Sequence, residues 1–307
     1  MQRRFIDYAV ISLKGLAMGA ADVVPGVSGG TIAFISGIYE ELITALNNIN
    51  LSLFRTLKKE GFKTAWSQLN GNFLLALFTG IGISVLSLAK GLEWVLHHHP
   101  ILIWSFFFGL VLASVLFIGK QIKKWNFGII ASLITGAFVA YYITTIPSLA
   151  SSNSGSLFLF FAGALAVCAM ILPGISGAFI LVLLGAYQPV LEAVNNKDIK
   201  SIFFIGLGAV IGLLSFSKLL KWLFKNYHNL TLAILTGFIL GSLNKIWPWK
   251  KVLSFRTNSK GEQIPFLEES ISPFSFEGDN QIVFALGLII IGFMTIFILE
   301  KLGSKKQ

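Results

Sequence analysis

Charged side chains are scarce in this chain. Asp, Glu, Lys and Arg make up 12% of its 307 residues, against about 25% in ordinary globular proteins. Hydrophobic residues make up 55%, and the mean hydropathy is +0.77. So little charge cannot cover a surface in water, which excludes a soluble enzyme or a nucleic-acid-binding domain. The net charge of +10 is therefore no sign of a nucleic-acid partner, although it would suggest one in a soluble chain.

Cysteine and histidine are also rare. The single cysteine, Cys168, can form no intramolecular disulfide, which excludes a disulfide-stabilised scaffold. Three of the four histidines, His97, His98 and His99, share one predicted loop with no acidic or cysteine partner nearby, so we predict no metal site. The Gly-x-x-x-x-Gly-Lys loop of nucleotide-binding proteins is absent. We expect neither a cofactor nor a nucleotide partner.

Apolar runs long enough to cross a bilayer are abundant, since about 20 residues suffice. Two pairs of runs are joined by uncharged breaks, Pro25–Gly30 and Pro173–Gly177. A Pro-Gly break at membrane depth is tolerated only where protein or an aqueous cavity shields the backbone. Each pair is therefore predicted to form a re-entrant hairpin, followed by three crossings. The predicted elements are hairpin 5–46 with helices 73–96, 101–119 and 127–146, and hairpin 157–194 with helices 201–220, 230–247 and 281–300.

The distribution of Lys and Arg predicts the orientation in the membrane. With the N-terminus inside, fourteen of them fall in cytoplasmic segments and six in outer ones, in the sense of the positive-inside rule. Both termini are then cytoplasmic. The basic start of the chain resembles a signal peptide, but Asp7 and Lys14 interrupt the apolar stretch behind it, so we expect it to be retained.

The chain contains an internal repeat. A shift of 148 positions places Gly15 on Gly163, Pro25-Gly26 on Pro173-Gly174 and Ser28-Gly29 on Ser176-Gly177. Further along, a shift of 128 aligns residues 86–109 with residues 214–237. Each repeat, 1–150 and 151–307, crosses an odd number of times whether its hairpin is re-entrant or spanning, so the second must be inverted. The predicted fold is an all-α polytopic membrane protein with two inverted-topology repeats, an architecture typical of secondary transporters.

The motifs resemble those of a known family. Residues Lys14–Thr31, with Pro-Gly-Val-Ser-Gly-Gly at their end, are similar to the signature of the polyprenyl-phosphate transporter family of bacterial membrane proteins. Leu172–Gly177, followed by Gly185-Ala186-Tyr187, shares the resemblance, which covers nearly the whole chain. It implies a flippase of the bacterial cytoplasmic membrane that returns undecaprenyl phosphate, the lipid carrier of cell-wall sugars, to the inner leaflet. Segment 249–280 matches no expectation from the family.

The two breaks also have a physical interpretation. A helix that starts inside the membrane presents free N–H groups and a positive dipole end, which together favour an anion. Glycines let a phosphate approach the backbone, and hydroxyls donate hydrogen bonds to it. The alternative is that small residues only permit close helix packing. The predicted phosphate-binding residues are Lys14, Pro25, Gly26, Ser28, Gly29, Gly30, Thr31, Pro173, Gly174, Ser176 and Gly177.

Acidic residues near the first break are candidates for coupling or gating. Charged groups at membrane depth are costly and usually face a cavity or a partner. Asp22, Glu40 and Glu41 could carry protons or respond to another ion, while Lys14 could be the counter-charge of the phosphate. Alternatively, Lys14 and Asp22 form a structural pair, and Glu40 and Glu41 lie at the cytoplasmic headgroup level.

Two other functions compete with lipid transport. A secondary transporter of a small anion would use the same pair of helix starts. The Gly-x-Ser-Gly pattern around Ser28 and Ser176 also occurs in intramembrane serine proteases, but a serine nucleophile needs a general base. All four histidines are predicted in loops. We therefore predict no catalytic residue and no enzymatic activity.

Overall fold

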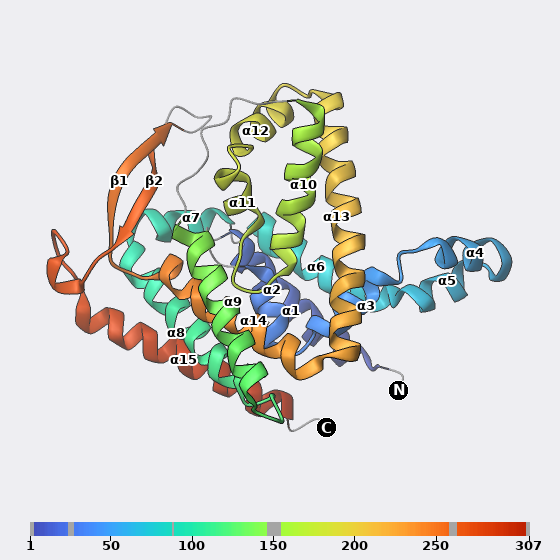
Figure 1. Cartoon of the computed structure of the whole chain (residues 1–307), viewed down its shortest axis with the longest axis horizontal. Coiled ribbons are helices and arrows are strands. Elements are labelled where there is room, and N and C mark those ends of the chain that lie inside the picture. The colour runs from blue at the N-terminus through green and yellow to red at the C-terminus, as the bar shows by residue number, and fades with distance from the viewer. Residues whose placement is uncertain (1–2, 24–27, 88, 146–154, 258–262, 305–307) are drawn as a thin grey trace.

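The computed structural model describes residues 3–23, 28–87, 89–145, 155–257 and 263–304. The chain is mainly helical (Figure 1). By length and composition, four described helices could each cross a bilayer: Pro100–Gly119, Phe127–Thr145, Ile199–Asn226 and His228–Ile246. A fifth is added if the helices Phe62–Leu69 and Gly71–Ser87, bent by 64°, count as one span. The predicted class, a polytopic helical membrane protein, is confirmed at this level.

The first half of the chain contains nine helices in the described residues. They are α1 (Phe5–Val23), α2 (Gly29–Ile35), α3 (Tyr39–Asn47), α4 (Leu51–Glu60), α5 (Phe62–Leu69), α6 (Gly71–Ser87), α7 (Ala89–His98), α8 (Pro100–Gly119) and α9 (Phe127–Thr145). The predicted helix 73–96 is thus two helices, α6 and α7, and the sequence around their junction carries Lys90, Gly91 and Glu93. Residues 47–72, for which the sequence analysis predicts no element, contain α4 and α5.

The described second half has six α-helices, two short 3₁₀ helices and one hairpin of strands. They are α10 (Ser156–Ile171), α11 (Gly177–Leu183), α12 (Tyr187–Asn195), α13 (Ile199–Asn226), α14 (His228–Ser242), η1 (Leu243–Ile246), β1 (Lys250–Thr257), β2 (Gln263–Ser270), η2 (Pro273–Ser275) and α15 (Ile282–Ser304). The antiparallel β1–β2 pair is a departure from the all-α prediction. It lies in segment 249–280, where the indole N–H groups of Trp247 and Trp249 donate to the carbonyls of Ile271 and Asn280.

Each predicted hairpin is divided once more than the sequence analysis expects. The second limb of the first hairpin, predicted as one segment, is split into α2 and α3 at Gly37, and that of the other is split into α11 and α12 at Gly185. Both glycines have positive φ, 72° and 70°. At each, the glycine N–H and the next N–H bond back to the preceding turn, which is the Schellman arrangement that ends a helix. The repeat therefore extends to this second break.

The long helices pack in pairs that follow the repeat. Helix α1 packs along α6 as α10 packs along α13, and α9 packs along α14 as α15 packs along α8. A Cβ atom at Gly80 of α6 would overlap the backbone of α1, and one at Gly208 of α13 would overlap that of α10. Gly109 of α8 and Gly237 of α14 have the same relation to α15 and α9. Both glycine pairs are related by the 128-residue shift of the sequence.

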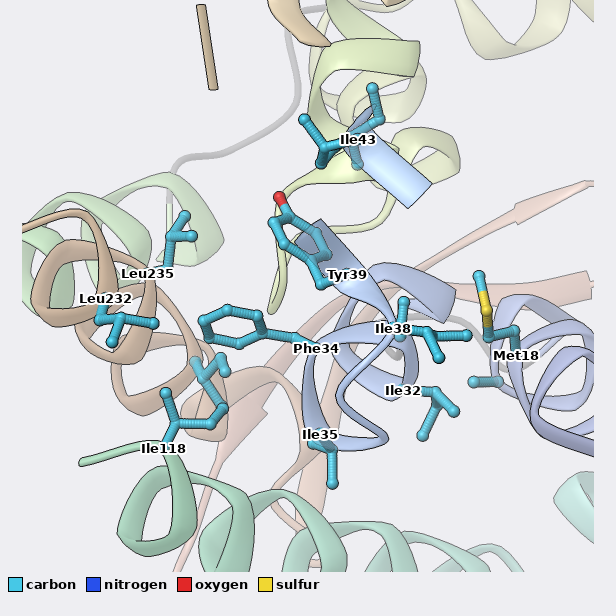
Figure 2. Packing of buried hydrophobic residues seen from close by; sticks show 14 of the residues in the cluster. Met18, Ile32, Phe34, Ile35, Ile38, Tyr39, Ile43, Ile118, Leu232 and Leu235 are labelled. Carbon is cyan, nitrogen blue, oxygen red and sulfur yellow. The ribbon is translucent and has the colours of Figure 1, made fainter. Parts of the chain in front are cut away.

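The main hydrophobic core lies around α2 and α3. Phe34 and Tyr39 contact each other edge to face, with ring centroids 5.0 Å apart. Figure 2 shows both rings on the same side of these helices as Leu232 and Leu235 of α14, while Met18 lies on the other side. Every described residue of α2 is buried. The segment that follows the first Pro-Gly motif is therefore packed in the middle of the helices, where the motif contacts the rest of the chain.

Candidate functional site

The two Pro-Gly-x-Ser-Gly segments meet in the structure. The N–H of Gly174 donates to the Thr31 hydroxyl at 2.8 Å. The Ser28 hydroxyl lies 3.2 Å from the carbonyl oxygen of Met170 and 3.4 Å from that of Leu172. Segments about 145 positions apart in the sequence are thus in direct contact. Pro25 and Gly26, the other predicted residues of the first motif, lie outside the described residues.

The start of α2 is capped from two sides. Ser28 is the N-cap residue, and its hydroxyl accepts a hydrogen bond from the N–H of Gly30 at 3.1 Å. The Asp22 carboxylate accepts from the N–H of Gly29 at 2.7 Å. A Cβ at Gly29 would press on Asp22, and one at Gly30 would meet the carbonyl oxygen of Ile171 at 2.6 Å. Both glycines are therefore required for this close approach, and Asp22 occupies the position that favours an anion.

The second motif is built differently. Gly174 has φ of +87°, and a Cβ there would lie 2.8 Å from both the Phe238 carbonyl oxygen and the Ser242 hydroxyl. Ser176 is the N-cap residue of α11, without a side-chain capping hydrogen bond. Under the 148-residue shift, Met170 stands where the first repeat has Asp22. Carboxylate capping is thus confined to the first motif.

The two motifs also differ in exposure. Ser28 and Thr31 are 1% exposed, and Gly29 and Gly30 are buried. Pro173 and Gly174 are buried as well, whereas Ser176 and Gly177 are half-buried. In this conformation the described part of the first motif is closed off from solvent, and the second retains partial access.

Lys14 and Asp22 bind opposite ends of α2. The Lys14 ammonium donates to the carbonyl of Ser36, the C-cap residue of α2, at 2.7 Å, whereas Asp22 binds the N-terminal amide. The eight positions between them correspond to about 12 Å along α1. A cation at the C-terminus and an anion at the N-terminus both complement the helix dipole. The two side chains therefore hold α2 against α1, which is a structural role separate from any contact with a ligand.

Glu40 and Glu41 lie away from the two motifs. Glu41 accepts two hydrogen bonds from Arg3, at 2.5 and 2.6 Å, and one from Asn70 at 2.7 Å. Glu40 lies 3.8 Å from the imidazole of His228. Arg3 precedes α1 and Asp22 lies near its other end, about 28 Å away along a helix of this length. These contacts tie the N-terminal segment, α3, the α5–α6 joint and the start of α14 together.

Two cations with aromatic contacts were not predicted as site residues, and one of them contacts the helix that follows the second motif. The Lys245 ammonium lies 5.1 Å from the ring of Phe179, which is in the first turn of α11. Lys250 lies over the ring of Trp104 at 4.1 Å and 3.5 Å from the Glu268 carboxylate. Burial lowers the pKa of Lys250 to about 8, and Glu268 offsets part of that effect. In the sequence, only their position around Trp247-Pro248-Trp249 distinguishes these lysines.

The described contacts of Ser28 do not resemble those of a catalytic nucleophile. Its hydroxyl lies near backbone carbonyls and accepts from a backbone N–H. His228, the histidine in the second half of the chain, is paired with Glu40 at the start of α14. The described residues include no group of three or more His, Cys, Asp or Glu side chains arranged to hold a metal ion.

Comparison with known proteins gives a consistent family. Residues 18–264 match the undecaprenyl phosphate translocase-like family. The chain is 48% identical to the polyprenyl-phosphate transporter of Vibrio cholerae, across 99% of this chain and all of that protein. It is 31% identical to the polyprenyl-phosphate transporter of Staphylococcus aureus, across 77% of this chain and 85% of the other. No solved structure matches it.

Proposed function

Because the chain belongs to the undecaprenyl phosphate translocase-like family, as its motifs indicate, we propose that it moves a polyprenyl phosphate between the leaflets of the bacterial cytoplasmic membrane. Both relatives are named as polyprenyl-phosphate transporters, and the same lipid is the proposed substrate here. The observation that carries the proposal is the contact of Thr31 with Gly174, since it brings both Pro-Gly-x-Ser-Gly motifs to one place. An alternative mechanism such as a nucleotide-driven pump has no supporting motif.

The proposed architecture is a pair of inverted repeats, 1–150 and 151–307. The equivalent helix pairs and their equivalent glycines support it, and an odd number of crossings in each half requires the inversion. Each hairpin is proposed to be re-entrant. The orientation follows from charge. Arg3 binds Glu41, Lys120 lies over Phe297 near the end of α15, and the N–H of Lys123 donates to Asn229 at the start of α14. We assign this end of the molecule, which also carries both termini (Figure 1), to the cytoplasm. Alternating access between the halves would then expose one site to either leaflet.

The proposed site holds the phosphate head between the two motifs. Hydroxyls of Ser28, Thr31 and Ser176 and backbone amides of Gly29, Gly30, Gly174 and Gly177 are the donors, and Pro25, Gly26 and Pro173 shape the turns that present them. Several of these donors are already paired within the protein. Substrate binding must therefore exchange internal hydrogen bonds for bonds to phosphate oxygens.

Asp22 is the proposed coupling group. A phosphate monoester carries a charge of about −1.5 to −2 near neutral pH, and it repels a carboxylate at the same amide. For a phosphate to reach the N–H of Gly29, Asp22 must move away or take up a proton. During this change Lys14 still holds the C-terminal end of α2 and supplies a positive charge from α1. Glu40 and Glu41 are proposed to gate the cytoplasmic end, because Glu41 pairs with Arg3 and Glu40 lies against His228 of the second half.

Transport by the purified protein in vesicles tests this proposal. Asp22→Asn, which cannot take up a proton, and Ser28→Ala, which loses one hydrogen bond, are each expected to lower the rate of polyprenyl phosphate flipping by about tenfold. Lys251→Gln, an exposed change in segment 249–280, is the control and should keep the normal rate. Unchanged rates in both site variants would remove these residues from the site. Transport of inorganic phosphate in place of the lipid would favour a small-anion transporter.

A further inference from the structure

The helices α4 and α5 form a hairpin of their own outside the helix pairs that make up the body. In Figure 1 they extend to one side, beyond α3 and α6. Gly61 joins them with φ of +84°, the two helices pack on each other, and the Gln68 amide donates to the Ser52 hydroxyl at 2.9 Å. The Asn48 amide ties the base of the hairpin to the carbonyl of Gln68 at 2.8 Å.

The hairpin exposes four large apolar side chains. Leu51 is 77% exposed, Phe54 58%, Leu57 44% and Phe62 68%. Leu51, Phe54 and Leu57 are spaced three residues apart, so they share one face of α4. An apolar stripe of this kind on a helix that is otherwise polar is typical of segments that lie in the membrane interface.

The charges of the hairpin are almost all positive. Residues 51–69 contain four cations, Arg55, Lys58, Lys59 and Lys63, against one acid, Glu60. Lys58, four positions after Phe54, lies on the same face of α4 as the apolar stripe, where its long side chain can extend to the headgroups, and the cations of α4 are all exposed. Lysine and arginine next to an inserted apolar face complement the phosphates of anionic lipids. A protein partner would need an equally acidic apolar groove, for which the chain gives no indication.

Chain connectivity places the hairpin at the membrane surface. Helix α6, an apolar helix of 17 residues, begins at Gly71, and only Asn70 separates it from α5. Between α5 and α6 the chain bends by 64°, with Asn70 in the left-handed conformation at φ of 58°. If the apolar α6 enters the membrane, a helix that departs from it so sharply is directed toward the membrane plane.

We infer that residues 51–69 lie on the headgroup layer at the end of the molecule that carries both termini and bind anionic phospholipid there. Leu51, Phe54, Leu57 and Phe62 enter the interface, and the four cations contact lipid phosphates. This surface is separate from the proposed transport site, and the inference does not depend on the transported substrate.

Fluorescence quenching on the full-length protein tests the inference. Phe54→Cys on the apolar face and Thr64→Cys, exposed and two positions from both Phe62 and Trp66, are made in a Cys168→Ser background and labelled with bimane. The proteins are placed in nanodiscs of phosphatidylcholine and phosphatidylglycerol, with a doxyl quencher near the headgroup. Normal elution in size-exclusion chromatography shows that each variant is folded. We expect roughly threefold stronger quenching at position 54 than at position 64.

Charge removal tests the anionic part separately. The combined changes Lys58→Gln, Lys59→Gln and Lys63→Gln should reduce quenching at position 54 to the level at position 64. The matched control, Lys197→Gln, Lys200→Gln and Lys251→Gln, removes three exposed charges elsewhere and should leave it unchanged. Equal, weak quenching at positions 54 and 64 would overturn the inference and favour a protein partner. If position 54 is quenched as strongly in nanodiscs of phosphatidylcholine alone as in nanodiscs that contain phosphatidylglycerol, the selection for anionic lipid is overturned.

Discussion

Replacing Gly174 by alanine should weaken the contact between the two motifs. Gly174 has φ of +87°, where an L-residue costs about 1–2 kcal/mol. The new Cβ would also lie 2.8 Å from the Phe238 carbonyl oxygen and from the Ser242 hydroxyl, an overlap that costs about 1–3 kcal/mol. Together these lower the free energy of unfolding by about 2–5 kcal/mol. The apparent melting temperature should fall by on the order of 10 °C.

Thermal unfolding in detergent, followed by the loss of the monodisperse peak in size-exclusion chromatography, measures this change. Gly206→Ala is a matched control, since Gly206 lies within α13 and a Cβ there meets no atom within 4 Å. That substitution should leave stability unchanged or raise it by up to about 1 kcal/mol, because alanine is the better helix former. A Gly174→Ala protein that melts with the wild type would mean that the turn is not held in this conformation.

Two further predictions concern buried polar groups. The Tyr39 hydroxyl is buried without a hydrogen-bond partner among the residues that the structure describes, so Tyr39→Phe should raise the free energy of unfolding by about 1 kcal/mol. A lower melting temperature in the same assay would contradict that. For Lys250, burial lowers the pKa to about 8 from 10.5, so between these values the unfolded chain binds a proton that the folded chain does not. Stability should therefore increase as the pH rises from 8 to 10.5, and hardly change just below 8. Comparison of melting temperatures with Lys250→Met, which removes the titrating group, isolates this contribution, and an equal rise in that variant would refute the assignment to Lys250.

The two helix starts after the Pro-Gly breaks are predictable because the repeat identifies them twice. The alignment of Ser28-Gly29 with Ser176-Gly177 marks both helix starts. In the structure, Ser28 and Ser176 are the N-cap residues of α2 and α11. The partners of the charged residues were harder to predict. Lys14 binds a carbonyl at the far end of α2 and not Asp22, because a long flexible side chain on a helix can reach several groups at similar distances.

Local breaks were underestimated for a related reason. The alignment pairs Gly37 with Gly185, but an isolated glycine in an apolar run does not by itself show that a helix ends there. The positive φ at both positions depends on what the following residues contact. Residues 51–69 lie between the predicted apolar segments and have no predicted helix, although Asn50 caps the first helix there by accepting from the N–H of Ser52 at 2.8 Å.

The sequence alone determined that this is a helical membrane protein with a duplicated Pro-Gly-x-Ser-Gly motif, since hydropathy and repeat spacing are properties of the chain read residue by residue. Only the tertiary structure decided that Thr31 meets Gly174 and that Asp22 caps α2. Those contacts depend on how helices far apart in the chain approach one another. That approach is set by backbone-to-backbone packing at small residues, and the identity of a small residue does not indicate which residue it will contact.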